Sequence, residues 1–110
     1  MSEDIRPRIR LPQSARRGEI VEIKLLVQHA MESGQRRGAD GALVPRKILN
    51  TMRVRYGGKD VLTAKLEAAI AANPFFSFHL RAESTGPVDF VWVDDDGREY
   101  RAREQLKVVG

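Results

Sequence analysis

The sequence predicts an all-β fold, a sandwich of about seven strands in a single domain that spans residues 1–110. Hydrophobic and polar residues alternate with a period of two along most of the chain, and turn-forming residues interrupt this alternation at intervals of roughly 8 to 12 residues. A chain of 110 residues can bury a hydrophobic core without disulfides or metals. The absence of cysteine excludes a disulfide framework, a thiolate metal site and a cysteine nucleophile.

The first two strands are predicted from Ile5 to Leu11 and from Glu19 to His29. In the first, hydrophobic residues alternate with arginines, and Pro7 favours a position at a sheet edge because it has no N–H to donate. In the second, alternate residues from Val21 onward are apolar and are expected to face the core. Residues 15–18 between the two strands are expected to form a loop.

Residues 30–45 break the alternation and read as a long polar loop. A loop of this length in a compact domain is usually either functional or mobile, and the sequence leaves both interpretations open.

A hairpin follows, with strands from Ile48 to Tyr56 and from Asp60 to Leu66. Gly57-Gly58 is expected to form its two-residue turn, because both central positions of a type I′ turn need a positive φ. The alanine-rich residues 67–72 predict one or two helical turns, which Asn73-Pro74 would stop.

Three further strands complete the fold. From Phe75 to Arg81, alternate residues beginning with Phe76 are expected to face inward. After a turn at residues 84–87, the next strand places its alternate residues from Val88 inward.

Residues 94–97, three aspartates and a glycine, predict a hairpin turn with Asp96-Gly97 as its central pair. The last strand is predicted from Arg98 to Val109. The number and spacing of the strands favour an immunoglobulin-like β-sandwich, although the Cys…Trp…Cys signature of antibody domains is absent.

No pattern of chemistry-bearing residues predicts catalysis or metal binding. His29 and His79 lie far apart in the sequence, and neither belongs to a cluster of potential metal ligands. The aspartates at 94–96 are consecutive, whereas a calcium loop spaces its ligands at alternate positions and ends in a glutamate. The chain has no Gly-x-Ser-x-Gly elbow and no phosphate-binding loop. We therefore expect no enzymatic activity, no cofactor and no metal.

The charge is unevenly distributed. Residues 1–59 carry 13 Lys or Arg against 6 Asp or Glu, a net charge of +7, whereas residues 60–110 carry 6 against 9, a net charge of −3. Nucleic-acid binding is therefore the alternative function, through the basic residues Arg6, Arg8, Arg10, Arg16, Arg17, Arg36, Arg37, Arg46, Lys47, Arg53 and Arg55. Against it, aromatic residues make up only 6% of the chain, and the basic strands lack the exposed rings on which single-strand binders stack bases.

Several segments resemble a known family in their order and spacing. They are His-Ala-Met-Glu-Ser-Gly-Gln-Arg at 29–36, Val-Pro-Arg at 44–46, Ala-Asn-Pro-Phe-Phe at 72–76 and Trp-Val-Asp-Asp-Asp-Gly at 92–97. With the openings at 6–9 and 17–20, they resemble the SoxZ family of bacterial sulfur oxidation. The resemblance extends from about residue 5 to residue 109, and the segment that begins at His29 is its most specific part.

The resemblance implies an immunoglobulin-like subunit that forms a heterodimer with a SoxY-like sulfur-carrier protein. SoxY has a related fold and holds sulfur intermediates covalently on a cysteine in a flexible C-terminal arm. This chain would be the non-catalytic scaffold of the pair, in transient contact with the other Sox components. The absence of cysteine agrees with that role, because sulfur cannot be held here. Whether the pathway oxidises thiosulfate or a related compound stays open.

The residues expected to bind the partner belong to the resembling motifs and lie at strand ends or in the long loop. They are His29, Met31, Glu32, Ser33, Gln35, Arg46 and Phe75. The alternative is that Met31 and Phe75 fill the core and that Gly34 only shapes the loop.

The N-terminal residues lack the apolar core and cleavage site of a secretory signal. Together with the resemblance, this predicts a periplasmic location reached by co-export with a signal-bearing partner. No apolar run approaches the roughly 20 residues that cross a bilayer, so no membrane segment is expected. Without its partner, a sandwich with an exposed binding sheet could form a homodimer.

Overall fold

The computed structural model describes residues 7–29, 31–66 and 74–110, and these residues form nine β-strands and no helix. The strands are β1 (Arg8–Arg10), β2 (Ala15–Arg16), β3 (Ile20–Leu26), β4 (Leu49–Tyr56), β5 (Lys59–Lys65), β6 (Phe75–Arg81), β7 (Gly86–Asp94), β8 (Glu99–Leu106) and β9 (Val108–Val109). The all-β prediction is confirmed. The number of strands is nine rather than about seven, because the structure adds the two-residue strands β2 and β9. The helical turns predicted at 67–72 lie outside the described residues.

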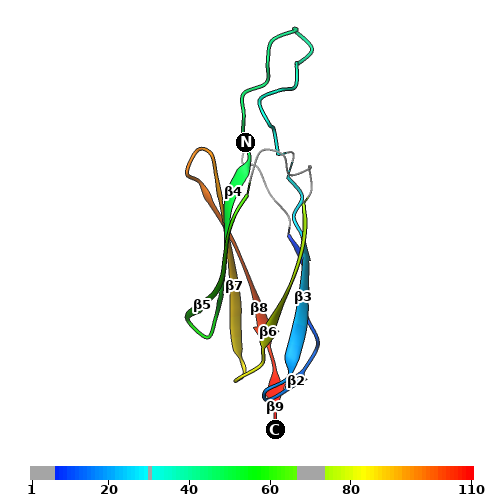
Figure 1. The fold of residues 1–110 in the computed structure, drawn as a ribbon, viewed down its shortest axis with the longest axis vertical. Helices are drawn as coiled ribbons and strands as arrows, with labels where there is room; N and C mark the ends of the chain where they lie inside the picture. The colour runs from blue at the N-terminus through cyan, green and yellow to red at the C-terminus, as the bar shows by residue number, and fades with distance from the viewer. Residues whose placement is uncertain (1–6, 30, 67–73) are drawn as a thin grey trace.

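Two antiparallel sheets pack against each other (Figure 1). One has the strand order β1-β3-β6, and the other has the order β5-β4-β7-β8. Strands β2 and β9 pair in parallel, with Ala15 opposite Val108 and Arg16 opposite Val109. Because β2 follows β1 and β9 follows β8, this short pair links the two sheets at the end of the molecule opposite the segment between β3 and β4 (Figure 1). The edge strands β5 and β6 lie at one edge of the sandwich.

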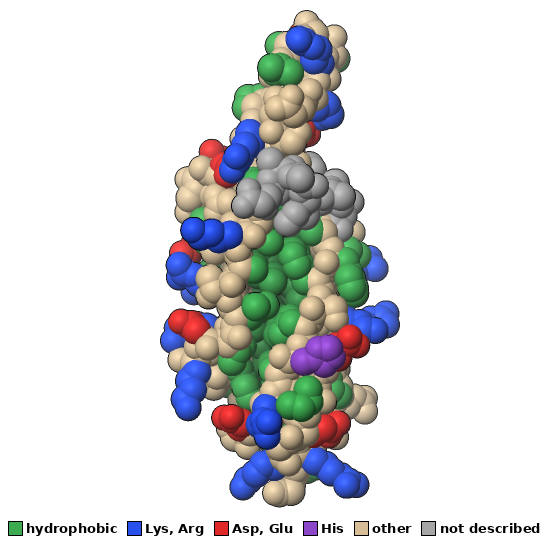
Figure 2. All heavy atoms as spheres, in the orientation of Figure 1, with side chains coloured by type: hydrophobic (Ala, Val, Ile, Leu, Met, Phe, Trp, Pro, Cys, Tyr) green, Lys and Arg blue, Asp and Glu red, His purple; other side chains and the backbone are tan. Residues whose placement is uncertain are grey.

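The core lies between the sheets, as the alternation predicts. Buried and less buried residues alternate along the whole of β7, and the rings of Phe90 and Trp92 stack with centroids 6.0 Å apart. At the edge of β5 and β6 four inward residues are only partly buried, namely Leu62, Ala64, Phe76 and Phe78, whereas Leu80 is buried. Figure 2 shows hydrophobic side chains gathered between the two sheets along one face of the molecule.

The turns confirm one prediction and correct another. Gly57 and Gly58 have φ values of +59° and +84° and connect β4 to β5, as predicted. The turn between β7 and β8 is centred on Asp95 and Asp96 rather than on Asp96-Gly97, and Gly97 follows with a φ of +81°. The reason is the carboxylate of Asp94, which accepts hydrogen bonds from the N–H groups at 96 and 98 and fixes the chain one residue earlier.

Several segment boundaries also differ from the prediction; for example, the strand predicted to reach His29 ends at Leu26. Residues 15 and 16, predicted as loop, form β2, and the strand predicted from Arg98 to Val109 divides into β8 and β9. Both changes have one cause: the chain leaves the four-stranded sheet at Lys107, whose carbonyl accepts the Ala15 N–H at 2.9 Å. Gly86 and Pro87, predicted in a turn, belong to β7.

In the part of the chain that the structure describes, no helix is long and apolar enough to cross a membrane.

Candidate partner-binding surface

Between β3 and β4 the chain leaves the sandwich as an arm, residues 31–47, which projects from one end of the molecule (Figure 1). A backbone bridge joins Glu32 to Lys47 at its base, and a second joins Arg37 to Leu43 near its tip. With the arm included, the molecule measures 59 × 22 × 20 Å. The predicted long loop therefore consists of two facing segments, joined by backbone bridges, that project away from the core.

Met31 fixes the point at which the arm leaves the sandwich. Its φ of +51° lies in the left-handed region, which residues other than glycine rarely adopt. Its side chain is 5% exposed, its sulfur accepts the Leu49 N–H at 3.4 Å, and its own N–H donates to Nδ1 of His29 at 2.9 Å. A strained backbone persists only where its surroundings hold it, so these contacts set the direction of the arm.

Asp95, in the turn between β7 and β8, holds the returning side of the arm. Its carboxylate accepts two hydrogen bonds from the Arg46 guanidinium, at 2.9 and 3.2 Å. It also accepts the Ile48 N–H at 3.2 Å and the Asn50 side-chain amide at 3.1 Å. The bonds from Arg46, with those from Asn50 and Ile48, lower the pKa of Asp95 although partial burial opposes them. The ionised carboxylate therefore ties the arm to the sandwich.

Asp94 supports the same turn from inside the sandwich. Its side chain is almost fully buried and accepts hydrogen bonds from the Tyr100 hydroxyl at 2.9 Å and from the N–H groups of Asp96 and Arg98. Burial alone would raise the pKa of this carboxyl, but the bond from Tyr100 and the two backbone bonds outweigh it, so the pKa is lowered. The turn that holds the arm is thus itself rigidly held.

The stem of the arm is narrow because Gly34 has no side chain. Gly34 has a φ of +87°, and a Cβ there would lie 3.2 Å from Cβ of Arg46 on the opposite side of the arm. Beside it, Glu32 accepts hydrogen bonds from Arg36 at 2.6 to 3.1 Å, and these lower the pKa of Glu32. The Gln35 N–H donates to the Ser33 hydroxyl at 3.3 Å.

The structure brings six of the seven predicted partner-binding residues together at the base and stem of the arm: His29, Met31, Glu32, Ser33, Gln35 and Arg46. Met31 fills core, as the alternative interpretation held. The seventh, Phe75, does not fill core: it begins β6 on the outer side of its sheet and is 61% exposed. Which of these side chains contact a partner stays a prediction.

Sequence reasoning missed Asp95 and Asn50, which hold the arm from positions far away in the chain. The signal available was the number of carboxylates: residues 94–96 carry three, and the turn itself uses the side chain of Asp94. The carboxylate of Asp95 is not needed within the turn and accepts hydrogen bonds from residues outside it.

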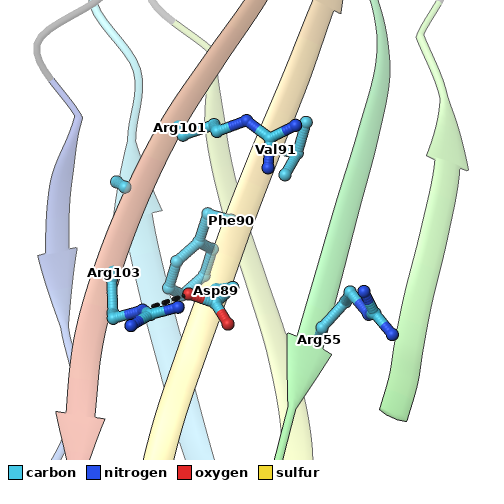
Figure 3. Close-up of a pocket in the computed structure, with 7 residues that line it drawn as sticks. Arg55, Asp89, Phe90, Val91, Arg101 and Arg103 are labelled. Carbon is cyan, nitrogen blue, oxygen red and sulfur yellow. Dashed lines mark hydrogen bonds and ion pairs between the residues drawn. The ribbon is translucent and has the colours of Figure 1, made fainter. Parts of the chain in front are cut away.

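The outer face of the four-stranded sheet carries a shallow groove of about 390 Å³ (Figure 3). Arg101 and Arg103 on β8 flank Val91 and Asp89 on β7, and Asp89 pairs with Arg103. Arg101 pairs with Glu99, and Arg55 pairs with Asp60. These cations are therefore largely neutralised by carboxylates on the same face.

The basic residues considered for nucleic-acid binding lie on different parts of the molecule. Arg8 and Arg10 are on the outer side of β1, whereas Arg53 and Arg55 are on the outer side of β4 in the other sheet. Four of the basic residues are paired with carboxylates: Arg36, Arg46, Lys47 and Arg55. The described residues thus form no single cationic track. Among them, no group of three or more His, Asp or Glu side chains is placed to hold a metal ion.

Comparison with solved structures shows that this fold occurs in proteins with different activities. A variant of the superoxide reductase (neelaredoxin) from Ignicoccus hospitalis shares 15% identity at a TM-score of 0.70, covering 94% of this chain and 79% of that one. The sulfur carrier protein SoxY from Chlorobium limicola f thiosulfatophilum shares 18% identity at a TM-score of 0.67, covering 99% and 84%. At these identities the likeness shows the fold alone.

Comparison of the amino-acid sequence, unlike comparison of the fold, identifies a particular family. No curated protein matches the chain. A protein family does match, the one described as sulphur oxidation protein SoxZ, and the match covers residues 9–105. Because that stretch includes both sheets and the entire arm, the chain belongs to the SoxZ family and is a subunit of a Sox sulfur-oxidation system.

Proposed function

We propose that this chain is the non-catalytic scaffold of a sulfur-carrier heterodimer, in which a SoxY-like partner carries sulfur covalently on a cysteine. The single observation that carries the proposal is the SoxZ family match over residues 9–105. The composition supports the division of roles, since a chain without cysteine cannot hold a thiol-linked intermediate. The pathway that we propose is the oxidation of thiosulfate or a related sulfur compound.

The arm supplies the physical basis for binding a partner. It projects beyond the sandwich, and Leu43 near its tip is 54% exposed. Its base is already ordered by Met31 and by the Asp95–Arg46 pair. A preformed arm loses little conformational entropy on binding, so more of its contact energy appears as affinity. The exposed Leu43 and the ordered stem therefore suit a stable contact with another chain.

The two histidines support a role without catalysis. Nδ1 of His29 accepts the Met31 N–H, so that ring atom serves the structure of the arm. His79 lies on the exposed outer side of β6, with Nε2 3.9 Å from the Glu22 carboxylate. Neither arrangement joins a nucleophile to a general base in the manner of an acyl-transfer site.

The test is co-expression with the SoxY-like chain of the same genome, followed by measurement of mass, stoichiometry and sulfur adducts. We expect a stable one-to-one complex with adducts only on the partner's cysteine. Two chains that elute separately at micromolar concentration would contradict the proposal.

We also propose that the pair works in the periplasm and that the partner's export signal carries both chains there. Cell fractionation of the same co-expression strain tests this. The chain should appear in the periplasmic fraction only when the partner retains its signal, and recovery there without the partner would overturn co-export.

A further inference from the structure

The outer face of the three-stranded sheet differs from that of its neighbour. Strand alternation and register place a row of Arg8, Leu26 and Phe75 at the end near the arm, directly opposite one another across β1, β3 and β6. The next row holds Arg10, Lys24 and Ser77. Six residues of the first sheet, Arg8, Arg10, Lys24, Leu25, Leu26 and Phe75, line a shallow groove of about 340 Å³.

The charge on this face is not balanced. Its described outward side chains include four cations, Arg8, Arg10, Lys24 and Arg81, against one carboxylate, Glu22. Glu22 is engaged by Ser77 and Lys24. Among the described residues, Arg8, Arg10 and Arg81 have no carboxylate partner, whereas on the four-stranded sheet three of the arginines are paired. The unpaired cations favour an anionic surface.

The same face exposes large apolar side chains. Phe75 is 61% exposed and Ile20 is 55% exposed, although both stand on strands whose other side is buried in the core. Phe75 lines the same groove as Arg8, Arg10 and Lys24. An exposed aromatic side chain beside cations matches the composition of protein interfaces, in which aromatic residues and arginine are enriched.

This face is continuous with the arm. β3 ends at Leu26, and the next residue, Val27, donates its N–H to the Pro74 carbonyl at 3.0 Å, immediately before Phe75. The base of the arm, beginning at Met31, therefore lies at the same end of the sandwich as the row of Arg8, Leu26 and Phe75. A partner docked at this end would therefore lie next to both surfaces.

We propose that the outer face of β1-β3-β6 docks an acidic surface of the sulfur-carrier partner, with an apolar partner side chain packed on Phe75 and carboxylates facing Arg8 and Arg10. The proposal rests on the proposed function and adds which face of the sandwich is covered and by what chemistry. Association through this face is steered by charge and slows as salt screens it. The outer face of the four-stranded sheet stays uncovered.

The test compares three full-length variants with the wild-type chain in binding to the SoxY-like chain, at low and at moderate salt. Arg10→Glu is expected to weaken binding by about tenfold or more and to reduce its dependence on salt. Phe75→Ser is expected to weaken binding about tenfold without changing that dependence. Arg53→Glu is the matched control, because Arg53 is exposed on the opposite face and forms no ion pair among the described residues. It is expected to bind within about twofold of wild type.

The outcomes separate the two proposals. Suppose that the wild type binds, and that Arg10→Glu and Phe75→Ser bind within twofold of it. The choice of face is then wrong, but the proposed function stands. The same conclusion follows if Arg53→Glu weakens binding as much as the other two variants do. If the wild-type chain itself does not bind the partner, the proposed function is wrong and the docking proposal falls with it. Fluorescence of the buried Trp92 verifies that each variant is folded.

Discussion

At the scale of single residues, two adjacent aspartates hold one turn from opposite sides. Neighbouring residues at the end of a strand point to opposite faces, so Asp94 enters the sandwich while Asp95 faces the arm. Asp94 satisfies N–H groups of its own turn, and Asp95 satisfies the distant Arg46 and Asn50. Both carboxylates are stabilised in their ionised form, which makes the anchoring of the arm dependent on pH.

The variant Asp95→Asn is expected to lower the free energy of unfolding at pH 7 by about 1–3 kcal/mol, because a charged acceptor for Arg46 is lost. Since the pKa of Asp95 is lowered in the folded state, its stabilisation is present above the ordinary aspartate pKa of about 4 and is lost as pH falls through the lower folded value. Urea denaturation of wild type and variant should therefore show stabilities that converge as pH is lowered.

The control for this prediction is Asp96→Asn. Asp96 is 68% exposed, and among the described residues its side chain pairs with Lys47 alone, so its substitution should change stability by less than about 1 kcal/mol. A constant difference between wild type and Asp95→Asn at every pH would show that the charge of Asp95 is not what holds the arm.

At the scale of elements, the position of the arm depends on contacts with the sandwich, but the stability of the sandwich does not depend on the tip of the arm. Contacts at the tip are internal: the Arg37 guanidinium donates to the Gly41 carbonyl, and the Gly38 N–H donates to the Ala42 carbonyl. Replacing residues 37–43 by two glycines is therefore expected to change the free energy of unfolding by less than about 0.5 kcal/mol. The same change should weaken partner binding about tenfold or more, because it removes the exposed Leu43.

The measurements are urea denaturation and the dissociation constant with the SoxY-like chain. Wild-type affinity in the shortened chain would show that the arm tip is not part of the contact. A large loss of stability would show that the tip packs on the sandwich more than its hydrogen bonds indicate.

The elements that sequence predicts well are those with several alternating residues. The strand from Phe75 to Arg81 has the predicted bounds, and its inward residues are the predicted ones. The sequence predicts loop where β2 forms and one strand where β8 and β9 form, because two-residue strands carry no periodicity and the β2–β9 pairing joins segments far apart in the chain. The Asp95–Arg46 contact was missed because a turn already accounts for an aspartate, and its partner lies 49 residues away. The partner-binding role of the arm residues rests on the family resemblance rather than on any local pattern.

At the scale of the whole molecule, one tryptophan reports on both sheets. Trp92 is fully buried on β7 and stacks with Phe90, at the centre of the core. Phe90→Ala is expected to lower the free energy of unfolding by about 3–5 kcal/mol, because it leaves a cavity between the sheets. In the wild type, the shift of Trp92 fluorescence and the loss of far-ultraviolet circular dichroism should coincide in a urea titration. Separate transitions would show that the two sheets unfold independently.

The parallel pairing of β2 with β9 also determines when the fold can be completed during synthesis. β2 is made before strands β3 to β8, whereas its partner, residues 108–109, is made after them. Contacts between such distant segments form slowly, since the loop that they close contains nearly the whole domain. Until then the backbone groups of β2 that pair with β9 stay unpaired on the nascent chain. Truncation before residue 108 would therefore remove the pairing that links the two sheets at the end opposite the arm, while the strands of both sheets and the arm would still be made.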